Sequence, residues 1–108
     1  MIAKKILTNL NENESLVDVE SIPKVEMYAP NQFVIRIPSV GRVFQSYSTI
    51  ICFVDPSGKV FLDESAWDYS TTTGKYRNKF LSEGIAETRK KISTGEYTLT
   101  KLNRGNHY

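Results

Sequence analysis

The sequence predicts an α+β domain in which a small antiparallel sheet is covered on one side by helices. Apolar residues alternate with period two through much of residues 24–62, which is typical of strands. Apolar stripes with helical spacing follow in residues 69–92. The expected architecture is a meander of three to five strands, one kinked helix or two short helices, and a further C-terminal strand.

The chain length suits one domain preceded by an N-terminal arm. The 108 residues and 12.3 kDa provide enough chain for a single hydrophobic core. We expect an N-terminal arm over residues 1–23, one α+β domain over residues 24–103 and a tail over residues 104–108. Within the arm, residues 2–8 suit a short strand or helix, and polar residues after them suit a loop.

Strand patterns and one turn signal organise the first part of the domain. Alternation over residues 24–28 and over residues 32–37 predicts two strands. Residues 43–54 are rich in β-branched and aromatic residues and predict one long strand. Asp55-Pro56-Ser57-Gly58 predicts a type I turn, so residues 59–62 should return as the antiparallel partner of that strand.

Two apolar stripes predict the helical layer. One contains Tyr69, Thr73, Tyr76 and Phe80, and the other contains Leu81, Ile85, Thr88 and Ile92. At about 100° per residue the two stripes lie about 120° apart, so one straight helix would need two apolar faces. We therefore predict two helices, over residues 72–82 and 85–93, with a break near Gly84.

Local signals mark the ends of these helices. Hydroxyl side chains at residues 70–73 can cap the first helix. Gly95 suits the position just after the second helix, where a left-handed residue is favoured. Residues 96–100 alternate again and predict the final strand.

The composition excludes several kinds of site. Cys52 is the single cysteine, so an internal disulfide and a cysteine-based zinc site are excluded, and burial as a small apolar residue is expected. His107 is the single histidine, and at the second position from the end of the sequence we expect its side chain to be solvated. Serine and cysteine nucleophiles therefore lack the histidine base that they use in enzymes. Asp63, Glu64 and Asp68 lack a nuclease pattern and suit turns and helix caps better. We expect no enzymatic activity, no cofactor and no metal.

The sequence also gives an expectation about location. No run of 18 apolar residues is present, so no membrane contact is expected. The first seven residues lack the apolar region of a secretory signal. The expectation is therefore a cytoplasmic protein.

The C-terminal third holds the candidate binding residues. The net charge is +2, but residues 70–108 carry eight basic and three acidic side chains, whereas residues 1–30 carry three basic and five acidic ones. Aromatic and basic side chains alternate over residues 67–80, as they do on surfaces that bind single-stranded nucleic acid or proteins. The predicted binding residues are Trp67, Tyr69, Lys75, Tyr76, Arg77, Lys79, Arg89, Lys90 and Lys91. The alternative is that Trp67, Tyr76 and Phe80 pack the helix on the sheet, with the lysines solvated.

Residues 43–103 resemble a family of small uncharacterised proteins of bacteriophages and mobile elements. The resemblance is carried by Phe44–Ile51, Lys59–Asp63, Trp67–Ser70, Thr72–Arg77, Phe80–Leu81, Gly95–Leu99 and Leu102–Asn103. It implies no established activity and transfers no functional residue. It does imply a phage-like setting in the cytoplasm of a bacterial host, where small proteins without catalytic groups often bind macromolecules.

Two function hypotheses follow. The first is a non-enzymatic protein that binds a host or phage protein, for example an inhibitor of a host defence nuclease such as an anti-CRISPR protein. Its acidic residues Glu12, Glu14, Asp18, Glu20 and Glu26 would then imitate nucleic acid. The alternative is an accessory protein that binds DNA or RNA with its basic C-terminal third. A homodimer is compatible with both, because the edge strands of a small sheet can pair.

Overall fold

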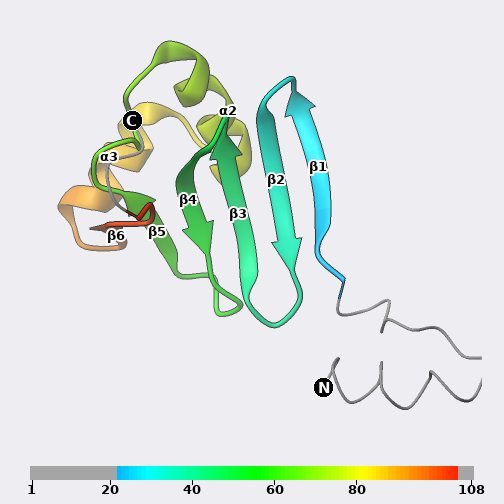
Figure 1. The fold of residues 1–108 in the computed structure, drawn as a ribbon. Coiled ribbons are helices and arrows are strands. Elements are labelled where there is room, and N and C mark those ends of the chain that lie inside the picture. The colour runs from blue at the N-terminus through cyan, green and yellow to red at the C-terminus, as the bar shows by residue number, and fades with distance from the viewer. Residues whose placement is uncertain (1–21, 105–108) are drawn as a thin grey trace, which may run out of the picture.

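The computed structural model describes residues 22–104, which form one six-stranded sheet with two helices on one side of it (Figure 1). The predicted α+β class is therefore confirmed. The expectations for residues 2–8, for the acidic residues of the arm before residue 22 and for His107 lie outside the described residues.

The strands are β1 (Lys24–Ala29), β2 (Gln32–Ile37), β3 (Gly41–Ser46), β4 (Thr49–Val54), β5 (Val60–Asp63) and β6 (Tyr97–Thr100). They lie in the sheet in the same order as in the sequence, and β1 to β5 form an antiparallel meander. β6 pairs parallel to β5, which requires a crossover. The helices α2 (Thr71–Leu81) and α3 (Ile85–Ser93) provide that crossover.

The prediction of one long strand over residues 43–54 is wrong, because the run contains two strands and a tight turn. The turn lies between Ser46 and Thr49, and Tyr47 has a left-handed backbone with φ of 55°. The Tyr47 amide donates a hydrogen bond of 2.7 Å to the Asn31 carbonyl, which anchors the turn to its neighbour. No glycine or proline marks this turn, so the apolar pattern on both sides concealed it.

The other predicted boundaries are confirmed. The Gly58 amide donates to the Asp55 carbonyl at 2.9 Å, as a turn over residues 55–58 requires. The Ser70 hydroxyl accepts from the Thr73 amide at 3.1 Å and caps α2. Gly84 separates the two helices, and Gly95 follows α3 with φ of 83°.

One face of the sheet packs against α2 and forms the core. Val34, Phe44, Cys52 and Leu62 occupy one row across four neighbouring strands, and all are fully buried. The Phe44 ring stacks on the Phe80 ring of α2 with centroids 5.9 Å apart. The burial expected for Cys52 is confirmed, and this burial raises the pKa of its thiol.

Asp63 at the end of β5 and Asn103 after β6 hold the backbone around the short strand β5. The buried Asp63 carboxylate accepts hydrogen bonds from the Ala66 amide at 2.8 Å and from the Leu102 amide at 2.9 Å. The Asn103 side chain accepts from the Ile50 amide and donates to the Ile50 carbonyl, at 2.8 and 2.9 Å. Ile50 of β4 has no partner in β5, and the Asn103 side chain makes the backbone hydrogen bonds that a neighbouring strand would make there.

Replacement of Phe44 by alanine should destabilise the fold, because Phe44 is fully buried between the sheet and α2. We expect Phe44→Ala to lower the free energy of unfolding by about 3–5 kcal/mol, measured by urea denaturation. Val25→Ala on the exposed edge strand is the control and should change it by about 0.5 kcal/mol or less. Equal effects of the two substitutions would contradict this description of the core.

Candidate functional site

Arg77, one of the predicted binding residues, lies inside the protein. It is 1% exposed, and its Nη1 donates to the Trp67 carbonyl at 2.7 Å and to Asp68 Oδ1 at 3.1 Å. Its Nη2 donates to the Asn78 side chain at 3.0 Å, and its guanidinium lies over the Trp67 ring. Arg77 therefore fixes the loop between β5 and α2 and presents almost no surface to a partner.

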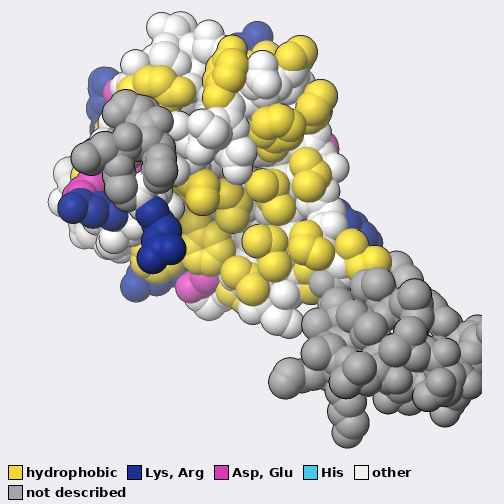
Figure 2. All heavy atoms as spheres, in the orientation of Figure 1, with side chains coloured by type: hydrophobic (Ala, Val, Ile, Leu, Met, Phe, Trp, Pro, Cys, Tyr) yellow, Lys and Arg dark blue, Asp and Glu magenta, His cyan; other side chains and the backbone are white. Residues whose placement is uncertain are grey.

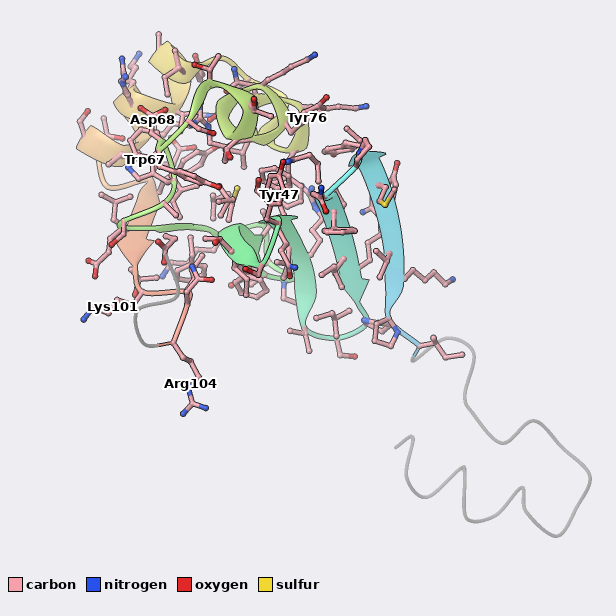
Figure 3. The ribbon with its side chains drawn as sticks, turned by 45° about the horizontal axis from the view of Figure 1, so that its top comes forward. Tyr47, Trp67, Asp68, Tyr76, Lys101 and Arg104 are labelled. Carbon is pink, nitrogen blue, oxygen red and sulfur yellow. The ribbon has the colours of Figure 1, made fainter. Side chains whose placement is uncertain are left out.

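Asp68 extends this network to α3. Its second carboxylate oxygen lies 3.2 Å from Arg89 Nη2, so one carboxylate contacts a buried and an exposed arginine. Figure 3 places Trp67 and Asp68 together beside the helices. An ion pair with so exposed an arginine contributes little stability, and Arg89 remains accessible.

Lys91 belongs to a half-buried cluster that joins α3 to β6. Its Nζ lies 2.7 Å from Glu83 Oε1, and the same carboxylate accepts hydrogen bonds from the Thr88 and Tyr97 hydroxyls at 2.7 and 2.9 Å. Burial opposes ionisation of Glu83, but the hydrogen bonds from Lys91, Thr88 and Tyr97 together hold its pKa below the usual range. Burial and the hydrogen bond to Glu83 raise the pKa of Tyr97 to about 12.

The remaining aromatic and basic side chains meet between β1 and α2. Tyr28 of β1 stacks on Tyr76 of α2 with ring centroids 6.3 Å apart. Lys79 Nζ lies 4.4 Å from the Tyr28 centroid, and Lys75 Nζ lies 5.3 Å from the Tyr76 centroid. We call these four residues the tyrosine–lysine patch. Tyr28 was not predicted, because its partner α2 is distant in sequence.

The last predicted residues are exposed and separate from one another. Tyr69 is 52% exposed in the loop before α2, and Lys90 is exposed near the end of α3. Tyr47, which was not predicted, is 59% exposed at the turn between β3 and β4 (Figure 3). Tyr69, Lys75 and Arg77 line one surface pocket at the start of α2, but the structure does not gather all nine predicted residues into one surface.

A group of apolar side chains lies on the other face of the sheet. Figure 2 shows hydrophobic side chains gathered over the face that the helices leave uncovered. The paired positions of this face run Val25, Ile35, Val43, Phe53 and Phe61 in one row and Met27, Phe33, Gln45 and Ile50 in the next. We call the eight apolar residues of these two rows the open apolar face, which the polar Gln45 interrupts in the second row.

The open apolar face carries no charged side chain among these residues. Its two edge residues, Val25 and Met27, are 63% and 58% exposed, and most of the others are half-buried. The rings of Phe53 and Phe61 stack with centroids 5.9 Å apart, which joins β4 and β5 within the first row. Apolar side chains that gather on one exposed face are a feature of protein contact surfaces.

The sequence pattern of β2 and β4 already indicates an apolar second face of the sheet. An antiparallel sheet with one solvated face alternates apolar and polar residues. β2 instead reads Phe33-Val34-Ile35, and β4 reads Ile50-Ile51-Cys52-Phe53-Val54, with apolar residues on both faces. Such strands indicate a sheet that is covered on both sides.

No catalytic or metal-binding arrangement stands out in residues 22–104. No group of three His, Cys, Asp or Glu side chains in that range could hold a metal ion. The Asp63 carboxylate, which the sequence placed in the densest acidic group, is occupied by backbone amides. In the described part of the chain, neither helix has the length and apolarity to cross a membrane.

Comparison with known proteins gives one match. Residues 5–98 match the model of DUF8033, a family of unknown function. No curated protein and no solved structure matches the chain. The matched range contains the open apolar face, the tyrosine–lysine patch and most of the segment before β1.

Glu83→Gln should weaken the fold in a pH-dependent way. Because folding lowers the pKa of Glu83 from 4.5, this carboxylate stabilises the fold above that pKa and loses its effect as the pH falls through the folded value. We expect the variant to be about 1–3 kcal/mol less stable at neutral pH, and urea denaturation should show the difference shrinking as the pH falls below 4.5.

Glu87→Gln is the control, because its contact with Lys91 is 3.8 Å long and its side chain is 57% exposed. It should behave like the unmodified chain within about 0.5 kcal/mol at each pH. A constant difference between Glu83→Gln and the unmodified chain from neutral to acid pH would contradict the role given to the Glu83 carboxylate.

Proposed function

Because the chain belongs to this family of unknown function, its role must be inferred from its surface, and we propose a non-enzymatic module that binds another protein. The observation that carries the proposal is the open apolar face. It spans β1 to β5 without a charged residue at its paired positions, and Val25 and Met27 at its edge are exposed. Burial of such a surface against a partner supplies the main free energy of protein association.

The electrostatics support a protein partner over a nucleic acid. Nucleic-acid binding needs several accessible cations that can meet phosphates. Of the basic residues predicted from the sequence, Arg77 and Lys91 are engaged in internal contacts. The open apolar face offers aromatic rings with one cation, Lys59, beside the Phe61 ring at its β5 end, and it suits a mainly apolar protein surface.

The partner class is also part of the proposal. The resemblance of residues 43–103 to phage and mobile-element proteins makes a host defence nuclease the first candidate to test. A contact through the open apolar face would inhibit such an enzyme by steric blockage, without the need for acidic residues that imitate nucleic acid.

The tyrosine–lysine patch favours a second candidate function. Lys75 and Lys79 lie over the rings of Tyr76 and Tyr28, and this combination can stack on bases and neutralise phosphates. The patch lies between β1 and α2, on the helix side of the sheet. The two candidate functions can therefore be separated by substitutions on opposite faces.

The tagged full chain should retain a protein from bacterial lysate even after nuclease treatment. Val25→Thr with Met27→Thr should abolish this retention, because threonine keeps the strand preference but removes apolar contact area. Mass spectrometry identifies the retained protein. Circular dichroism and urea denaturation should show an unchanged fold, since both residues are exposed.

Lys75→Ala with Lys79→Ala is the matched control on the opposite face and should leave retention unchanged. If the threonine variant retains the same protein as the unmodified chain, the proposed function is wrong. Binding of single-stranded DNA or RNA that weakens steeply with salt, and is lost only in the lysine variant, would support the second candidate instead.

A further inference from the structure

We propose that a hollow at one end of the sheet binds a small molecule through two adjacent phosphate groups. Three cations line this hollow, Lys24 of β1, Arg36 of β2 and Arg42 of β3. We call these three residues the cation row. The inference goes beyond the proposed function, because the cation row alternates along its strands with residues of the open apolar face and therefore lies on the opposite face of the sheet.

The strand register brings the three cations together. Lys24 pairs directly with Arg36, and Arg36 pairs directly with Arg42. Two residues further along β2 and β3, on the same face, Val34 and Phe44 belong to the core, so the cation row lies on the helix side of the sheet. Like charges at directly opposed positions destabilise a sheet. The fold therefore carries a cost at this row that a bound anion would remove.

Two carboxylates of the described residues lie near the cation row but do not neutralise it. Glu26 Oε1 lies 3.7 Å from Arg36 Nη2, and both side chains are more than half exposed, so this ion pair is weak. Asp55 lines the hollow, but its Oδ1 accepts hydrogen bonds from the amides of Ser57 and Lys59 and from the Ser57 hydroxyl. Three cations against two carboxylates leave a net positive charge for an anion to meet.

The hollow has the size and walls of a small-molecule site. Its volume is about 360 Å³, and ligand pockets in proteins hold about 300–1,000 Å³. Ile37, Pro38, Val54 and Pro56 form apolar walls beside the cations. Figure 1 shows the turn between β2 and β3 and the turn between β4 and β5, which supply these walls, at the same end of the sheet. Apolar walls exclude water, which strengthens the attraction between the cations and a bound phosphate.

The cation row combines one held side chain with two adaptable ones. The Arg42 guanidinium lies 4.6 Å from the centroid of the Phe80 ring, and its Nη1 lies 3.5 Å from the Phe80 carbonyl at the end of α2. A held arginine loses little freedom when its planar group binds a phosphate. Lys24 and Arg36 are exposed and can turn toward the ligand. The row spans two strand spacings, about 9–10 Å, which gives room for two adjacent phosphate groups.

Calorimetric titration of the full chain with inorganic pyrophosphate tests the site. Sodium chloride holds the ionic strength constant, because salt alone screens the attraction of any anion. We expect saturable binding of one pyrophosphate per chain. Lys24→Gln with Arg36→Gln should weaken the affinity about tenfold or more, because two of the three cations are lost. Both side chains are exposed, so circular dichroism should show an unchanged fold.

Lys90→Gln with Lys101→Gln is the matched control, because it removes the same charge from two exposed lysines that do not line the hollow. It should change the affinity less than about twofold, since salt screens distant charges. Equal losses in the two variants, or no saturable binding by the unmodified chain, would overturn the inference. Binding of a single-stranded oligonucleotide without binding of pyrophosphate would overturn it in favour of a nucleic acid.

Adenosine diphosphate distinguishes two sources of the same phosphate chemistry. Tighter binding than that of pyrophosphate, with the same loss in the double variant at Lys24 and Arg36, would support a nucleotide whose remaining part contacts the apolar walls. Equal or weaker binding with that loss would support inorganic pyrophosphate as the ligand. If adenosine diphosphate binds the double variant as tightly as the unmodified chain, it binds elsewhere and the nucleotide is excluded from this site.

The melting temperature gives a second readout. Pyrophosphate should raise it for the unmodified chain and for the lysine control, because a ligand that binds the folded state stabilises that state. It should not raise it for Lys24→Gln with Arg36→Gln, and an equal rise in this variant would overturn the inference. Val25→Thr with Met27→Thr, on the opposite face, should leave pyrophosphate binding unchanged, so this site and the proposed protein contact are tested separately.

Discussion

The fold depends on one constraint, which is that the middle of β2 and most of β4 are apolar on both faces. Val34 and Cys52 belong to the core, and the residues next to them, Phe33 and Ile35 in β2 and Phe53 in β4, are also apolar. A single layer of helices satisfies only half of this requirement, because α2 and α3 lie on one side of the sheet. The uncovered half is the physical basis for the proposed protein contact.

Hydrogen bonds and ion pairs of buried polar side chains hold the single helical layer in place. The buried Arg77 ties the loop after β5 to α2, and Glu83 ties α3 to β6 through Lys91 and Tyr97. Asp63 accepts hydrogen bonds from the amide of Ala66, after β5, and from that of Leu102, after β6. Arg77, Lys91 and Glu83 therefore serve the fold, and the other basic side chains of the C-terminal third determine its surface charge.

The sequence was sufficient to predict elements with strong local signals. The turn at residues 55–58, the cap at Ser70, the break at Gly84 and the helix end at Gly95 each depend on neighbouring residues, and all are confirmed. The turn at Tyr47 was missed because its left-handed residue is neither glycine nor asparagine. Local patterns do not reveal which charges pair across the fold, so the internal positions of Arg77 and Lys91 could not be foreseen.

The methyl nuclear Overhauser spectrum of the full chain tests the central claim most directly. If the second face of the sheet is a contact surface, the methyl groups of Ile35 and Val43 should show contacts with protons from outside residues 22–104. In a complex those protons would belong to the partner. Contacts with water alone, both in the free protein and with a retained partner present, would contradict the claim.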